Sequence, residues 1–162
     1  MGAGKINSCL LLSILLLLLT ACDKPREGYQ YAALNRGGSQ EVTFRFDMDS
    51  AVVYSTCFIC RYDLSRTDME ALKLFIKVTS PSGISYRDTA VFPLYRSKEQ
   101  AKGDPYTKFK IENNWNANIE WVWRVNVSSG EAGVWQISAR PESRKGLHSL
   151  GFSYKPSEER TR

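Results

Sequence analysis

The sequence has 162 residues, of which 43% are hydrophobic and 24% are charged, and its formal net charge is +5. A chain of this length fits one domain with a sizeable core and a short tether. Its basic and acidic residues are interspersed, which argues against a nucleic-acid-binding surface, because such a surface carries a basic stripe.

The N-terminus has the composition of a secretory signal. An apolar run over residues 9–19 follows Lys5 and ends in the small residues Thr20 and Ala21. The run is shorter than the roughly 20 residues that a spanning helix needs. We expect residues 1–21 to be removed as a signal peptide, which leaves 141 of the 162 residues with a net charge of +4, because Lys5 is the one charge removed.

The last residues of that signal resemble a lipobox. Leu19-Thr20-Ala21-Cys22 is similar to the motif at which bacterial lipoproteins are acylated and then cut before the cysteine. The resemblance implies a mature chain that begins at lipidated Cys22. Acyl chains hold a small domain at a membrane without a hydrophobic helix. We therefore expect a lipid-anchored protein of the bacterial cell envelope, in the outer membrane, with the leaflet left open.

The segment that follows is polar and punctuated by glycine, and residues 22–40 are predicted to be a flexible tether. Alternation of apolar and polar residues begins at Val42 and continues to Met48, which predicts a half-buried strand. The folded domain is predicted over residues 41–155, with a charged tail over 156–162.

Cys57 and Cys60 have the spacing of a redox dithiol, but they lie in the β-branched and aromatic run 51–62, which predicts a strand. Positions three apart on a strand face opposite sides of the sheet, about 10 Å apart, beyond the roughly 7 Å limit for a disulfide. We favour two structural strand cysteines with at least one in the core. A redox pair, or a bulge that lets the two thiols pair, is the alternative.

Further strand patterns follow along the chain. Leu72–Thr79, the turn Ser80-Pro81-Ser82-Gly83 and residues 84–92 predict a hairpin. Residues 98–105 are predicted to be a loop and 107–112 a strand. Residues 119–127 and 134–140, separated by a glycine-containing loop, are predicted to form a second hairpin, and 147–154 a last strand with Leu150, Phe152 and Tyr154 on one face.

About eight short strands and almost no helical periodicity predict an all-β fold, an antiparallel β-sandwich. The choice between jelly-roll and immunoglobulin-like connections stays open.

Several of these segments resemble the gliding-motility lipoprotein GldH family. The likeness rests on the lipobox, residues 72–83, Arg87-Asp88-Thr89 leading to Phe92-Pro93-Leu94, Gly133–Ile137 and Leu147–Phe152. It covers residues 42–154 and implies a non-catalytic envelope component linked to gliding or its associated secretion machinery. The tryptophan-rich segment 115–123 and the paired cysteines depart from the family pattern.

We expect no enzymatic site, cofactor or metal. His148 is the one histidine and is expected to be an ordinary strand residue. Zinc would need three or four ligands, and only Cys57, Cys60 and His148 are available besides carboxylates. Asp47 and Asp49 lack the glycine and distal glutamate of a calcium loop.

The aromatic residues are the better candidates for binding. Trp115, Tyr106 and Tyr95 are predicted to offer a flat amphipathic surface to another envelope protein or to a glycan. Trp121 and Trp123 share a strand face and are expected in the core. Trp115, between asparagines, is the best candidate for exposure.

Overall fold

The computed structural model describes residues 27–34, 41–66 and 69–157. Almost all of its regular structure is β. The strands are β1 (Gly28–Ala33), β2 (Val42–Met48), β3 (Val53–Asp63), β4 (Ala71–Thr79), β5 (Ser85–Pro93), β6 (Thr107–Ile111), β7 (Asn116–Ser128), β8 (Gly133–Pro141) and β9 (Leu147–Pro156), with one short helix, α2 (Lys98–Ala101).

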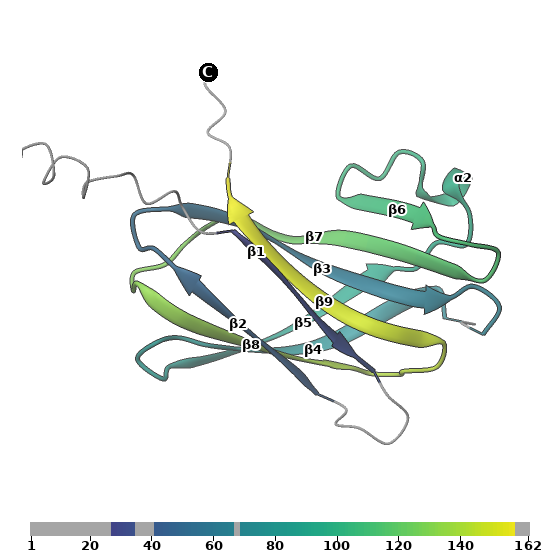
Figure 1. The fold of residues 1–162 in the computed structure, drawn as a ribbon. Coiled ribbons are helices and arrows are strands. Elements are labelled where there is room, and N and C mark those ends of the chain that lie inside the picture. The colour runs from purple at the N-terminus through teal and green to yellow at the C-terminus, as the bar shows by residue number, and fades with distance from the viewer. Residues whose placement is uncertain (1–26, 35–40, 67–68, 158–162) are drawn as a thin grey trace, which may run out of the picture.

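The strands form two antiparallel sheets packed face to face (Figure 1). The five-stranded sheet has the order β1-β9-β3-β7-β6, and the four-stranded sheet has the order β2-β8-β4-β5. The predicted antiparallel β-sandwich is confirmed, with nine strands in the described part of the chain against about eight expected.

The core lies between the sheets and follows the alternation in the sequence. On β2, Phe44, Phe46 and Met48 are buried while the residues between them face outward. Phe152 on β9 closes the core from the other sheet, because its ring centroid lies 5.3 Å from that of Phe46 and 5.5 Å from that of Phe58. Each such ring, buried in full, contributes on the order of 1.5–3 kcal/mol.

The predicted tether over 22–40 is wrong for Gly28–Ala33, which pair with β9 along their whole length as β1. The sequence does not reveal this strand because its inward-facing side carries no large apolar residue. Its inward positions are Gly28, Gln30 and Ala32, while the larger side chains of Tyr29 and Tyr31 point outward and are exposed. A strand with small and polar residues on its inward-facing side resembles a linker in sequence.

The first predicted hairpin is confirmed, since β4 and β5 pair from Ala71↔Pro93 to Thr79↔Ser85. The second is wrong. β7 pairs with β3 and β6 in one sheet, and β8 pairs with β2 and β4 in the other. The connecting loop crosses between the sheets, where Glu131 accepts hydrogen bonds from the backbone N–H of Ser82 (3.0 Å) and from its hydroxyl (2.8 Å).

The predicted loop over 98–105 contains α2. Ser97 caps this helix, because its hydroxyl accepts a hydrogen bond from the N–H of Gln100 at 3.3 Å. None of the helices in the described segments is long and apolar enough to cross a bilayer.

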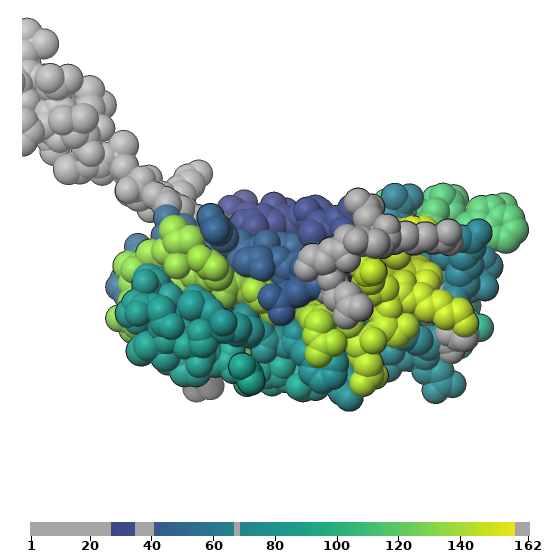
Figure 2. All heavy atoms as spheres, turned by 90° about the horizontal axis from the view of Figure 1, so that it is seen from below, coloured from purple at the N-terminus to yellow at the C-terminus, as the bar shows by residue number. Residues whose placement is uncertain are grey.

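The two ends of the sandwich carry different sets of loops. We call proximal the end at which β1 begins at Gly28, together with residues 49–52, 80–84 and 129–132. We call distal the opposite end, with residues 64–66, 94–97, 112–115 and 142–146. In Figure 2 the β4–β5 turn (teal) lies beside the yellow-green β7–β8 loop at the proximal end, and the green residues around β6 lie toward the distal end.

Candidate functional site

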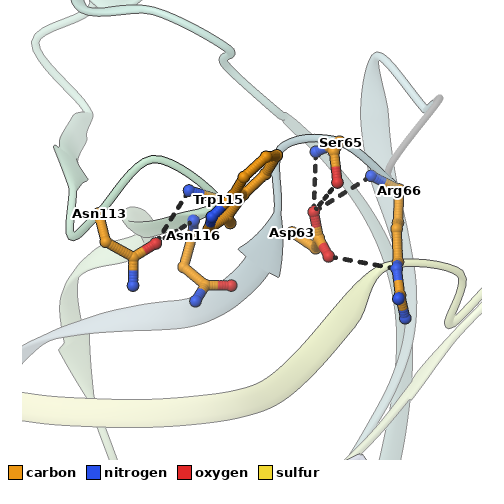
Figure 3. A network of polar contacts seen from close by, with 6 residues as sticks. All are labelled: Asp63, Ser65, Arg66, Asn113, Trp115 and Asn116. Carbon is orange, nitrogen blue, oxygen red and sulfur yellow. Dashed lines mark hydrogen bonds and ion pairs between the residues drawn. The ribbon is translucent and has the colours of Figure 1, made fainter.

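Trp115 lies at the distal end, in the turn between β6 and β7, and its side chain is 64% exposed. The turn is held from within by Asn113, whose Oδ1 accepts hydrogen bonds from the N–H of Trp115 at 2.9 Å and of Asn116 at 2.8 Å (Figure 3). An asparagine side chain that bonds the backbone two residues later is a common way to fix a tight turn. The predicted exposure of Trp115 is confirmed, and hydrogen bonds to Asn113 hold the backbone of its turn.

A second turn supports the first from the neighbouring strand. The N–H of Leu64 donates to the carbonyl of Trp115 at 2.7 Å, at the end of β3. There Asp63 Oδ1 accepts from the N–H of Ser65 (2.8 Å), the hydroxyl of Ser65 (2.6 Å) and the N–H of Arg66 (3.2 Å) (Figure 3). The hydroxyl of Ser65, first among these donors, lowers the pKa of Asp63. The two turns form one braced unit.

This arrangement presents an aromatic side chain on a fixed backbone. The backbone of Trp115 is fixed by two hydrogen bonds, one from its N–H to Asn113 and one to its carbonyl from the N–H of Leu64, while its side chain is exposed. Burying a rigid aromatic side chain against a partner gives a large contact area for little lost conformational entropy. We define the Trp115 loop as residues 112–116.

The other two predicted aromatic residues do not join Trp115 in one surface. Tyr106 is 65% exposed but precedes β6, whereas Trp115 follows it. The five residue steps from Tyr106 to Ile111 alone separate them by roughly 17 Å. Tyr95 is half-buried: its hydroxyl donates to Asp104 at 2.8 Å, and its ring packs against Phe109. The predicted three-residue platform is wrong, because periodicity does not report which turns lie together.

Trp121 is buried in the core, as predicted, and its indole N–H donates to the carbonyl of Pro93 at 2.8 Å. Trp123 is half-buried against the core and contacts Phe58, with 5.3 Å between ring centroids. Both tryptophans follow the prediction.

Cys57 and Cys60 lie on β3, both buried and not joined by a disulfide. Cys60 belongs to the core cluster and is 0% exposed, whereas Cys57 faces the outer side of the sheet beside Ser153 and is 6% exposed. Burial raises the pKa of each thiol. A reactive dithiol needs the opposite shift, so this geometry matches the prediction of structural cysteines.

The remaining predicted residues contribute no cluster. His148 is exposed on β9. Within residues 27–34, 41–66 and 69–157, no group of three or more histidine, cysteine or acidic side chains is placed to hold a metal ion. The lipidation site Cys22 lies outside the described residues.

The sequence pattern does not reveal the exposed tyrosines of β1, Tyr29 and Tyr31, because it predicts a tether over their segment. The ring of Tyr31 lies over Gly151 of β9, where a Cβ atom would come within 2.7 Å of Tyr31 Cδ1. The available signal was the alternation of tyrosine with glycine and glutamine over residues 28–31.

Comparisons with known proteins add no assignment. No family model matches the sequence, and no curated protein matches it. Two solved structures, of infectious bursal disease virus Gt strain and Gx strain, align with 14% and 13% identity and TM-scores of 0.21 and 0.20. The alignments cover 85% and 83% of this chain but only 43% of each viral chain, so the chain spans less than half of their length.

Proposed function

We propose that this chain is a non-catalytic, lipid-anchored protein of the bacterial cell envelope that binds another envelope protein through the Trp115 loop. The observation that carries the proposal is the exposure of Trp115 on a backbone held by hydrogen bonds to Asn113 and Leu64. Aromatic anchors of this kind supply most of the binding energy in many protein interfaces.

The position of the loop relative to the anchor supports this use. The lipobox pattern ends at Cys22, six residues before β1 begins at Gly28, and six residues span at most about 20 Å. A lipidated Cys22 would therefore hold the proximal end near the bilayer. Trp115 precedes β7, whose 13 residues extend about 40 Å to the proximal end. The indole would be offered away from the membrane.

The likeness to the GldH family supports a more specific role. It favours a component of gliding motility or of its associated secretion machinery, placed in the outer membrane. The partner would then be another protein of that assembly.

A glycan-binding lipoprotein is the second candidate. One observation favours it: the exposed indole of Trp115 lies between two asparagines, Asn113 and Asn116, in the same turn (Figure 3). A flat aromatic face beside amide groups suits a sugar ring as well as a protein. A glycan array probed with the wild-type chain and with Trp115→Ala separates the two classes.

The test of the leading proposal is photocrosslinking in the native bacterium. A photoreactive amino acid at position 115 is expected to capture one envelope protein, while the same amino acid at Val134, which is exposed near the proximal end, captures none. A Cys22→Ser arm reports whether capture needs the lipid anchor.

With the captured protein purified, Trp115→Ala should weaken binding roughly 30-fold, because truncating an anchor aromatic costs about 2 kcal/mol. Tyr106→Ala, equally exposed but outside the loop, is the matched control. Equal capture at positions 115 and 134, or unchanged affinity in Trp115→Ala, would overturn the proposal.

A further inference from the structure

A second feature lies at the other end of the sandwich. A cavity of about 310 Å³ opens between the two sheets in their proximal half, lined by residues of β2, β3, β4, β5, β7 and β8. Phe46 and Ile137 form buried parts of its lining, and Trp123 and Trp135 contribute their half-buried side chains. Its volume is at the lower limit of the range for small-molecule sites.

The sheet topology explains why the sandwich is open here. β6 pairs with β7 only as far as Trp121, so in the described structure the β7 segment from Trp123 to Ser128 has no strand beside it on that side. The facing strand β5 is the edge of its own sheet. On the opposite side the sheet edges are joined, because the side-chain amide of Gln30 bonds the backbone N–H and carbonyl of Arg45.

Charged groups gather at the mouth of the cavity. Arg124 Nη2 lies 2.7 Å from Asp88 Oδ2 and so bridges β7 to β5. The guanidinium of Arg124 lies 5.2 Å from the centroid of the Trp123 ring. Arg87 also borders the cavity, but it pairs with the exposed Lys77 on the outer face of the sheet, so the charged side chains at the mouth are those of Arg124 and Asp88. An apolar cavity with a guanidinium at its mouth can bind an amphiphile with one anionic head.

We propose that this cavity binds a medium-chain fatty acid, with its hydrocarbon chain between the sheets and its carboxylate at Arg124. An apolar cavity of 150 Å³ holds benzene, so twice that volume fits a chain of about 12 carbons. The guanidinium fork of Arg124 can bond a second carboxylate beside Asp88. This inference goes beyond the proposed function and is independent of the Trp115 loop, at the other end of the molecule.

The test uses the full chain in nanodiscs of neutral phosphatidylcholine, with 12-bromododecanoate as the probe. Bromine on the chain quenches the fluorescence of nearby tryptophans, and Trp123 and Trp135 line the cavity. We expect saturable quenching of part of the emission, with one site per chain.

A cavity-filling variant identifies the site. Val127 lines the cavity, whereas Val125 on the same strand is exposed. Val127→Phe is expected to weaken binding at least tenfold, and Val125→Phe to leave it unchanged. Val78→Phe, from β4, fills the same cavity and replaces Val127→Phe if near-ultraviolet circular dichroism shows that variant to be misfolded.

The hydrocarbon chain and the carboxylate of the fatty acid are tested separately. Shortening the probe by two methylenes should weaken its binding about 15-fold, at about fourfold per methylene. The neutral alcohol 12-bromododecan-1-ol, and Arg124→Gln with the acid, should each bind at least tenfold more weakly.

Non-saturable quenching, equal binding by the filled variants, or equal affinity for the acid and the alcohol would overturn the proposal. Binding of the probe only by the Cys22→Ser variant would also overturn it, because the acyl group on Cys22 would then be the occupant of the cavity in the lipidated protein. None of these outcomes bears on capture at Trp115, so the two proposals fail separately.

Discussion

Cys57 and Cys60 illustrate what a local pattern determines at the scale of one residue. Their spacing fits a redox dithiol, but the strand geometry of β3 sends the two side chains to opposite faces of the sheet. Cys60 enters the core, and Cys57 lies under the outer face beside Ser153. Strand periodicity was enough to predict this outcome, because it depends on backbone geometry alone.

The thiols should be inert in the native protein. Burial raises the pKa of both cysteines, so neither forms a thiolate near neutral pH, and alkylation must wait for unfolding or local opening. Iodoacetamide at pH 8, followed by peptide mass spectrometry, should label Cys57 and Cys60 at least about a hundredfold more slowly in the folded chain than in guanidinium. Rapid native labelling, or a disulfide between the two, would contradict this.

At the scale of a strand, β1 shows where sequence patterns fail. Its buried side carries Gly28, Gln30 and Ala32, which bury little apolar surface. What holds the strand is close backbone pairing with β9 and the side-chain bonds from Gln30 to β2. Neither leaves a hydrophobic signal in the sequence.

Close approach at Gly151 should therefore be needed for β1 to dock. In Gly151→Ala the added methyl would lie 2.7 Å from Tyr31 Cδ1 and 3.1 Å from the carbonyl oxygen of Gln30. We expect a loss of about 1–3 kcal/mol in the free energy of unfolding, measured by urea denaturation.

Two further variants serve as controls for Gly151→Ala. Gly130→Ala should be nearly neutral, because a Cβ there meets nothing within 4 Å. Adding Tyr31→Ala to Gly151→Ala should restore part of the stability, since it removes the closest contact. Additive effects of the two substitutions would show that the ring of Tyr31 is not the obstacle.

At the scale of the whole molecule, three aspartates stabilise turns or link separate elements. Asp63 fixes the turn that braces the Trp115 loop, Asp88 links β5 to β7, and Asp104 bonds Thr107 and Tyr95. Each has a lowered pKa. The largest cause is the hydroxyl of Ser65 for Asp63, the guanidinium of Arg124 for Asp88 and the hydroxyl of Thr107 for Asp104.

These lowered pKa values predict acid sensitivity. In the unfolded chain the three carboxyls take up protons at a higher pH than in the folded chain, so stability is fully present above their ordinary pKa of about 4 and is lost as the pH falls below it. The thermal midpoint, followed by circular dichroism from pH 7 to pH 2.5, should fall in the acid range.

Asparagine at all three positions should lower the midpoint at pH 7 and flatten its fall in acid. Glu70→Gln is the matched control, because the side chain of Glu70 is exposed and makes no hydrogen bond or ion pair with other described residues. An acid transition of the same size in the triple variant would assign the sensitivity to other groups.

The sequence by itself determined the class of fold, the burial of most strand positions and the exposure of Trp115, because these follow from alternation and turn residues within a few positions of each other. The lipid anchor at Cys22 stays a prediction, and it too rests on a few neighbouring residues. Only the tertiary structure decided that β7 and β8 belong to different sheets, that β1 belongs to the domain, and that Trp115 and Tyr106 are apart. It also decided where the cavity opens. The physical reason is that alternation states which face of a strand is buried, whereas the neighbour of each strand is set by packing between residues far apart in the chain.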